Sequence, residues 1–304
     1  MNILRKIERI LNALIRRGYW FNHVKFKDCR NLSSYNTFDT DVVNLGSTSS
    51  VHAFDYSDVS LKCGNWALSS NPLMGDLAIL KNYFGYLKEG TSTVIIPLCP
   101  FSSLAGRYVI TEDKYYTILY PSTIPDFSIQ RYRQISHDWM KPLTSYSLLS
   151  LFVDLFHIFP FHRGRIISEN GMLSDSKRWM NDWMKEFSIA NFSYSLSMIN
   201  QDGIETAASY LNEIIDFCRQ HNIQPVLLIP PVYHTLGELL KPEIRKLIID
   251  SLVEKVEDKS VWFHNYMDDP VFSYNRDFFY NSFLMNKKGA ALFTKRVLND
   301  LKLL

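Results

Sequence analysis

Cysteine is scarce in this sequence, and the few cysteines stand far apart. Four occur in 304 residues, at Cys29, Cys63, Cys99 and Cys218, with no CxxC pair and no Cys/His spacing typical of a metal site. A disulfide framework and a structural zinc site are therefore not indicated, and we expect neither a metal nor a cofactor. Reduced thiols in the core of a cytoplasmic protein fit this spacing better.

An excess of charge of one sign is also lacking. The sequence has 33 Lys and Arg against 31 Asp and Glu, which gives a formal net charge of +2. This balance does not predict nucleic acid as a partner, because nucleic-acid-binding domains usually carry a basic excess. Glycine-rich phosphate motifs are missing as well, since neither GxGxxG nor a lysine-bearing phosphate loop occurs.

Long apolar runs are absent. No stretch reaches the roughly 18 to 20 consecutive apolar residues that a membrane-spanning helix needs. At the N-terminus, Lys6, Glu8 and Arg9 interrupt the apolar positions and no small-residue cleavage site follows, so a signal peptide is not indicated. We therefore expect a cytoplasmic protein.

Apolar strand-like segments alternate with helical patterns over much of the chain. This alternation predicts an α/β fold with a doubly wound, mainly parallel five-stranded sheet and a helical insertion. The expected strands are 41–47, 59–63, 93–98, 225–231 and 261–263, and the helices between and after them are 76–87, 204–221, 241–256 and 286–301.

Three segments are expected from the places where this alternation starts and stops. Residues 1–40 form an N-terminal amphipathic helix and a lead-in, and residues 41–106 and 202–304 together form the α/β domain. Residues 107–201 lack strand periodicity and are rich in aromatic residues, so we expect a helical insertion there that acts as a lid or a docking surface.

Residues 2–17 have apolar positions at helical spacing with basic residues between them. Two interpretations of this basic amphipathic helix stay open. It lies on an anionic membrane surface, at the inner face of the cytoplasmic membrane, or its apolar face packs on its own domain or on a partner chain.

The first strong strand ends in Gly46, Ser47, Thr48, Ser49 and Ser50. Ligands of open α/β sheets bind outside the carboxyl ends of the strands, so this cluster of hydroxyls is the candidate site. Two other interpretations remain open. The cluster is a polar turn that caps the next helix, or it cradles a phosphate at a helix N-terminus.

The order of the motifs resembles that of the SGNH (GDSL-type) hydrolases. Gly46-Ser47-Thr48 stands where the family has Gly-Asp-Ser, and Asn281-Ser282-Phe283-Leu284 stands where it has Asp-x-x-His. Asn286-Lys287-Lys288-Gly289 is similar to the segment that follows that histidine. Ile229-Pro230-Pro231-Val232 looks like the penultimate strand of the branch that acylates bacterial capsule, O-antigen and teichoic acid. The resemblance covers 41–102 and 204–303.

The chain departs from the family at all three triad positions. Thr48 stands in place of the serine, Asn281 in place of the aspartate and Leu284 in place of the histidine. A hydroxyl is a poor nucleophile unless an oriented base takes its proton, and leucine cannot do so.

Three alternatives follow from these departures. In the first, Ser47, Ser49 or Ser50 works with His52 or His234; in the second, Asp277 supplies a carboxylate to that histidine. In the third, no covalent catalysis occurs, and the pocket binds an acyl donor or a glycan.

The resemblance also suggests residues that bind substrate. Asn65 lies near the place of an oxyanion-hole residue, and Gly46, His52 and Asn281 complete the candidate substrate-binding set. Cys99 has no basic neighbour to activate it and is better explained as a core residue.

The function that the resemblance implies is transfer or removal of an acyl group, as an ester or amide, on a sugar of a bacterial surface polysaccharide. The partners would be a sugar or lipid-linked glycan, an acyl donor and a membrane acyltransferase. The alternative is a catalytically inactive SGNH-like protein that binds a glycan or acts as a scaffold in such an assembly.

Overall fold

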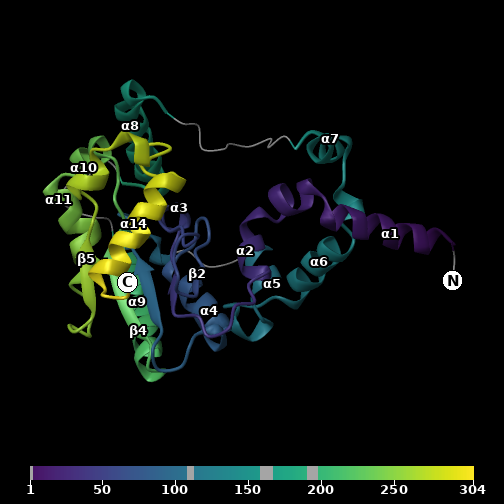
Figure 1. The fold of residues 1–304 in the computed structure, drawn as a ribbon, viewed down its shortest axis with the longest axis horizontal. Coiled ribbons are helices and arrows are strands. Elements are labelled where there is room, and N and C mark those ends of the chain that lie inside the picture. Colours follow the sequence, from purple (N-terminus) through teal and green to yellow (C-terminus); the bar gives the residue numbers. More distant parts are fainter. Residues whose placement is uncertain (1–2, 108–112, 158–166, 190–197) are drawn as a thin grey trace. The chain divides into compact units, whose positions relative to one another are not determined.

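The computed structural model describes residues 3–107, 113–157, 167–189 and 198–304, and the chain forms two compact units (Figure 1). One unit comprises residues 1–35 and 110–163, and the other comprises residues 36–109 and 164–304. The candidate site lies in the second unit, which contains the sheet.

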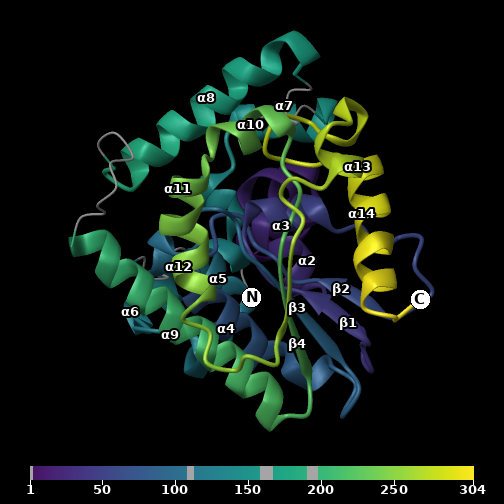
Figure 2. The same ribbon diagram turned by 90° about the vertical axis from the view of Figure 1, so that its left-hand side faces the viewer.

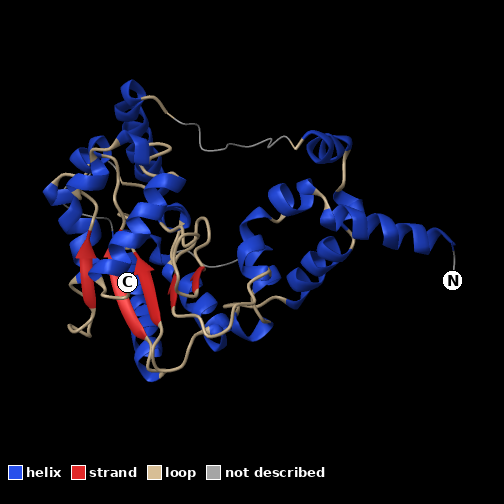
Figure 3. Cartoon of the chain, viewed as in Figure 1, coloured by secondary structure: helices blue, strands red, loops and turns tan. Residues whose placement is uncertain are grey.

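The sheet has five parallel strands in the order β2-β1-β3-β4-β5, drawn as red arrows in Figure 3. The strands are β1 (Val42–Asn44), β2 (Cys63–Asn65), β3 (Thr93–Pro97), β4 (Gln224–Ile229) and β5 (Trp262–Asn265). The expected α/β fold with a doubly wound parallel sheet is thereby confirmed.

Helices cover both faces of the sheet (Figure 2). The helices of this unit are α3 (Thr48–Ala53), α4 (Leu73–Tyr83), α8 (Glu169–Glu186), α9 (Met198–Gln220), α10 (His234–Leu239), α11 (Pro242–Arg245), α12 (Ser251–Val253), α13 (Pro270–Ser273) and α14 (Lys287–Asp300). Helices α4, α9 and α12 pack together on one side, and α3 and α14 pack together on the other.

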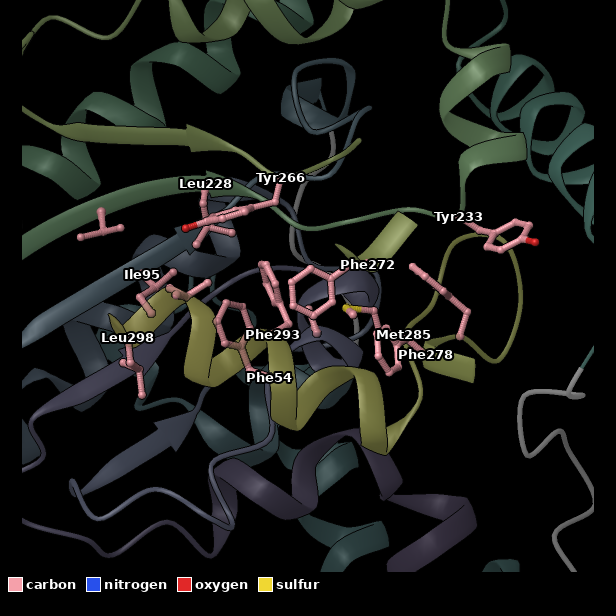
Figure 4. Packing of buried hydrophobic residues seen from close by; sticks show 14 of the residues in the cluster. Phe54, Ile95, Leu228, Tyr233, Tyr266, Phe272, Phe278, Met285, Phe293 and Leu298 are labelled. Atoms are coloured by element: carbon pink, nitrogen blue, oxygen red, sulfur yellow. The ribbon is translucent and has the colours of Figure 1, made fainter. Parts of the chain in front are cut away.

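The core on the α14 side contains the inward residues of the central strands. Ile95 and Leu228 project from β3 and β4 toward Phe293 of α14, and Phe54 packs beside that ring (Figure 4). Alternate residues of β3, such as Val94 and Ile96, are also fully buried. Burial of successive residues explains why this strand is apolar throughout, since both of its faces are covered.

Two expected elements differ from the structure. The second strand is 63–65 rather than 59–63, because the backbone turns at Val59, whose N–H donates to the carbonyl of Tyr56 (3.2 Å). The expected helix 241–256 is divided into α11, a π-helical turn (Lys246–Asp250) and α12.

The other unit is helical in the part that the structure describes. Its helices are α1 (Ile3–Arg17), α2 (Arg30–Ser33), α5 (Asp113–Ile118), α6 (Ile129–Met140) and α7 (Leu148–Phe156). Helices α1, α6 and α7 contribute to a small apolar cluster that includes Ile15, Trp20, Phe21, Trp139 and Val153. Nowhere in the described ranges is there a helix of sufficient length and apolar character to span a bilayer.

The structure divides residues 107–201 differently from the single insertion that we expected. Residues 113–157 group with the N-terminal residues, because Asn12 Oδ1 accepts from the N–H of Leu143 (2.9 Å) and Asp154 Oδ1 accepts from the N–H of Trp20 (2.5 Å). Helix α8 groups with the sheet instead, because Asp175 Oδ2 accepts from the hydroxyl of Ser282 (2.8 Å).

Candidate functional site

A narrow crevice lies at the carboxyl ends of β1, β3 and β4. Ser49 comes from the helix after β1, Cys99 follows β3, Pro231 follows β4, and Phe283 and Met285 come from the loop before α14. The crevice is too narrow to hold a water molecule. The chain leaves β1 and β3 on opposite sides in a sheet of this order, and the crevice therefore lies at the topological switch point.

The loop before the last helix lies against the end of the first strand, as the candidate site requires. His52 of α3 contacts Tyr280 edge-on, with ring centroids 5.9 Å apart. Helices α3 and α14 pack on each other. The structure therefore brings Ser49 of the hydroxyl cluster together with Phe283 and Met285 of this loop at the same crevice.

Gly46 turns the chain out of β1 with a positive φ of 109°. Its N–H donates to Asp76 Oδ1 (2.8 Å), which also accepts from Asn71 Nδ2 (2.5 Å). A Cβ at position 46 would lie 2.2 Å from the hydroxyl of Ser50, so only glycine leaves room for that side chain. Gly46 therefore has a structural role beneath the crevice.

Asp76 was not found by sequence reasoning. It belongs to α4 and is fully buried, and burial raises the pKa of its carboxyl to about 7 against the opposing hydrogen bonds from Gly46 and Asn71. The sequence gives one signal for it. Asp76 is an acidic residue in a helical segment whose other residues, such as Leu77 and Ile79, are mostly apolar and buried. Such a residue needs a partner within the protein.

The four hydroxyls differ in their surroundings. Ser47 is the N-cap of α3 but its side chain makes no capping bond, and Thr48 Oγ1 accepts from the N–H of Ser70 (3.2 Å). Among the described residues, the buried hydroxyls of Ser49 and Ser50 have no hydrogen-bond partner. Ser49 lines the crevice, whereas Ser50 packs beneath Gly46.

Neither candidate histidine is paired with these hydroxyls in the described part of the chain. Burial lowers the pKa of His52, so its imidazole is neutral near pH 7 and has a free lone pair. His234 begins α10, and its Nδ1 lies 2.9 Å from Glu238 Oε1. Its ring stacks on Tyr274 with centroids 4.8 Å apart.

Asp277 does not complete a triad with His234. Its side chain is exposed and lies 3.9 Å from Lys288 Nζ, an ion pair at the surface. No hydrogen bond or ion pair between Asp277 and His234 occurs among the described residues.

Asn65 fixes the end of β2 rather than facing the crevice. Its Oδ1 accepts from Asn44 Nδ2 (3.0 Å) and from the N–H of Ala67 (3.1 Å). Its Nδ2 donates to the carbonyls of Val51 (3.3 Å) and Phe54 (3.2 Å) at the end of α3. With both ends of the amide occupied, Asn65 holds α3 in place.

Asn281 and Leu284, at the family's acid and base positions, have structural roles. Asn281 Oδ1 accepts from the N–H groups of Phe283 (3.0 Å) and Leu284 (2.8 Å), so it shapes a turn. The side chain of Leu284 is buried.

Cys99 is not an activated thiol. Burial raises the pKa of Cys99, so the thiol is protonated at neutral pH. Over the described ranges, no group of three or more His, Cys, Asp or Glu side chains is placed to hold a metal ion.

Helix α8 holds the loop that closes the crevice. The buried Asp175 accepts from both the N–H (3.0 Å) and the hydroxyl (2.8 Å) of Ser282 through Oδ2, and from Arg178 Nη2 (2.7 Å) through Oδ1. Phe283 packs on the rings of Trp179 and Trp183, each with centroids 5.0 Å away. One wall of the crevice therefore depends on α8.

Comparison with models of protein families gave no match to this chain, and a search of curated proteins gave no similar sequence. The resemblance to the SGNH hydrolases therefore stays an interpretation of the motifs and of their order.

Proposed function

We propose that this chain is an SGNH-like binding protein of bacterial surface-polysaccharide assembly. In this proposal the crevice takes the acyl group of an acylated sugar or lipid-linked glycan and presents it to a membrane acyltransferase, without forming a covalent intermediate. The single observation that carries the proposal is the lack of a base on the crevice hydroxyl, since the hydroxyl of Ser49 has no hydrogen-bond partner among the described residues.

The physical reason is the high pKa of an ordinary serine hydroxyl. Such a group attacks a carbonyl only when a neighbouring base removes its proton, and the base must itself be oriented by a third group. Here Asn281 Oδ1 accepts the backbone hydrogen bonds that shape a turn, and the side chain of Leu284 has no atom that can accept a proton. The parts of the usual triad are therefore replaced by groups that shape the loop.

The lining of the crevice has the chemistry to receive a small acyl group once the loop before α14 has moved aside. Pro231, Phe283 and Met285 provide apolar surface, and Ser49 provides one polar atom. An acyl chain needs apolar contacts along its length and one hydrogen bond at its carbonyl oxygen, which the Ser49 hydroxyl can donate.

Acyl transfer by the chain itself is the second candidate function. It is favoured by the positions of Ser49 and His52, which lie three residues apart on α3 and so on neighbouring positions of one helix face. In this scheme Ser49 Oγ attacks the acyl carbonyl, His52 takes the hydroxyl proton, and the leaving group departs with that proton. A sugar hydroxyl then attacks the acyl carbonyl on Ser49, His52 takes the proton of that hydroxyl and passes it to Ser49 Oγ, and Ser49 leaves as the free hydroxyl.

A serine-directed fluorophosphonate probe separates the two functions. We expect no labelling of the intact protein, with an active serine esterase as the positive control. Labelling that is lost in Ser49→Ala and His52→Ala, but kept in Thr48→Ala, would establish acyl transfer and contradict the binding function.

Calorimetric titration then tests binding directly. An O-acetylated oligosaccharide should bind, and the same oligosaccharide after alkaline removal of its acetyl groups should bind at least tenfold more weakly. Equal affinities for the two would show that the crevice does not recognise an acyl group.

The proposed location follows from the same function. Lipid-linked glycans are assembled at the cytoplasmic membrane, so we place the chain as a peripheral protein on the inner face of that membrane, in contact through α1.

A further inference from the structure

Most of the apolar face of helix α1 is not packed against the described residues of its own unit. Its buried residues are Asn12 and Ile15, and Asn12 Oδ1 accepts from the N–H of Leu143 (2.9 Å). The apolar stripe points outward instead. It consists of Ile3, Leu4, Ile7, Ile10, Leu11 and Leu14, each between 40% and 74% exposed.

Helix α7 likewise has an exposed apolar side, and the opposite, more polar side faces its own unit. Ser150, Val153 and Asp154 face the protein, although two of these three side chains are polar. The outward face consists of Leu148, Leu149, Phe152, Leu155 and Phe156, each between 55% and 77% exposed. At 100° per residue these five positions form one continuous apolar arc without a charge.

The two helices are joined within one unit by Asp154. Its carboxylate accepts from the N–H of Trp20 (2.5 Å), just after α1, and from the hydroxyl of Tyr146 (2.5 Å). Tyr19 and His157 stack with centroids 4.8 Å apart. These contacts explain why the polar side of α7 faces its own unit and leaves the apolar side exposed.

The charge of α1 indicates what covers this surface. The helix carries Arg5, Lys6, Arg9, Arg16 and Arg17 against the single acid Glu8, which lies 3.4 Å from Lys141 Nζ. A protein partner would need only the apolar stripe. An anionic bilayer matches both features, because it attracts basic side chains and accepts apolar ones at the level of the headgroups.

We propose that α1 and α7 together form a membrane anchor that lies in the interface of an anionic bilayer, with the apolar face of α7 inserted among the acyl chains. Neither helix spans the bilayer, since α7 has 9 residues and α1 has 15. This inference deepens the proposed location and does not depend on whether the crevice binds or reacts.

Vesicle flotation of the full chain tests the anchor. The vesicles are phosphatidylcholine alone, or phosphatidylcholine mixed with phosphatidylglycerol in equal parts. We expect the protein to float with the mixed vesicles. Phe152→Asn with Leu155→Asn should lower partition by about tenfold or more, because two large apolar groups lose their insertion.

Substitution of basic residues separates the contribution of charge to membrane binding from that of the apolar side chains. Arg5→Gln with Lys6→Gln should lower partition about tenfold on the anionic vesicles and leave partition on phosphatidylcholine unchanged. A matched control replaces two exposed leucines outside the anchor, Leu173→Asn with Leu292→Asn, which are 47% and 44% exposed. This control should float like the unmodified protein.

Circular dichroism melts check that each variant folds, which we expect because the altered side chains are exposed. Flotation that does not change in the α7 variant, or that does not depend on phosphatidylglycerol, would contradict the anchor. A dimer in the absence of vesicles that dissociates in the α7 variant would assign the surface to a second copy of the chain. The α7 variant should retain the oligosaccharide binding of the unmodified protein, which keeps failure of the anchor distinct from failure of the proposed function.

Discussion

Single residues at the end of β1 show how closely the chain is fitted around the crevice. Sequence reasoning placed the hydroxyl cluster at the carboxyl end of the first strand, and Ser49 does line the crevice. It did not find Asp76, and it suggested a substrate-binding role for Asn65, whose amide is occupied by backbone and side-chain bonds. Most of those bonds join residues that are distant in sequence, so composition and spacing do not identify the partners.

Substitution of Gly46 should destabilise the fold through both strain and overlap. Gly46→Ala puts a side chain at a φ of 109° and 2.2 Å from Ser50 Oγ, so we expect a loss of about 3 kcal/mol or more in the free energy of unfolding. Gly90→Ala is the matched control, since its φ is 74° with no atom within 4 Å of the new Cβ. It should cost only about 1 kcal/mol, as measured by urea denaturation. If both substitutions lowered the free energy of unfolding by the same amount, the overlap with Ser50 Oγ would be relieved in the variant and the prediction would be wrong.

The presence of a helix or strand was easier to predict than the contacts that it makes with the rest of the chain. A helical, aromatic-rich segment was expected over residues 107–201, and the described part of this segment contains α5, α6, α7 and α8. Whether such a face is covered depends on contacts across the chain, and here α7 turns its polar side inward because Asp154 meets the N–H of Trp20. Likewise, the bond from Ser282 to Asp175 joins residues 107 positions apart.

A double-mutant cycle measures how strongly α8 holds the closing loop. Asp175→Asn and Ser282→Ala should each destabilise the protein, and their coupling energy should be about 1 to 2 kcal/mol because the buried carboxylate of Asp175 accepts from the Ser282 hydroxyl, the bond that Ser282→Ala removes. Asp182→Asn is the control, since this half-exposed acid pairs with the same Arg178 at the surface (3.1 Å). It should change stability by less than about 0.5 kcal/mol. A coupling energy near zero would mean that the loop is held by other contacts.

At the scale of the whole molecule, the alternation of strands and helices was sufficient to predict a parallel five-stranded sheet. The division into two units was not predictable, because it depends on which distant segments meet. Asp76 also acts at this scale, since its proton is linked to the folding of the entire chain.

The contribution of Asp76 to the stability of the protein should fall as the pH rises from about 4 to about 7. The pKa of Asp76 is raised from 3.8 to about 7 in the folded state, so in this range the folded chain holds a proton that the unfolded chain has lost. The change amounts to something on the order of 4 kcal/mol, and it levels off above the folded pKa. Asp76→Asn keeps an amide oxygen for Gly46 and should remove this component. Urea midpoints at intervals of pH provide the measurement, and identical profiles for both proteins would contradict the linkage.

The tightness of the crevice has a consequence for the rate at which a ligand arrives. In the proposed function, a space too narrow for water would have to open before an acyl group enters, so the ligand would capture only the open fraction of the molecules. In stopped-flow experiments the observed rate would then level off at high ligand concentration, at the frequency with which the loop before α14 swings away from Ser49. Loosening the hold of Asp175 on that loop would raise this plateau.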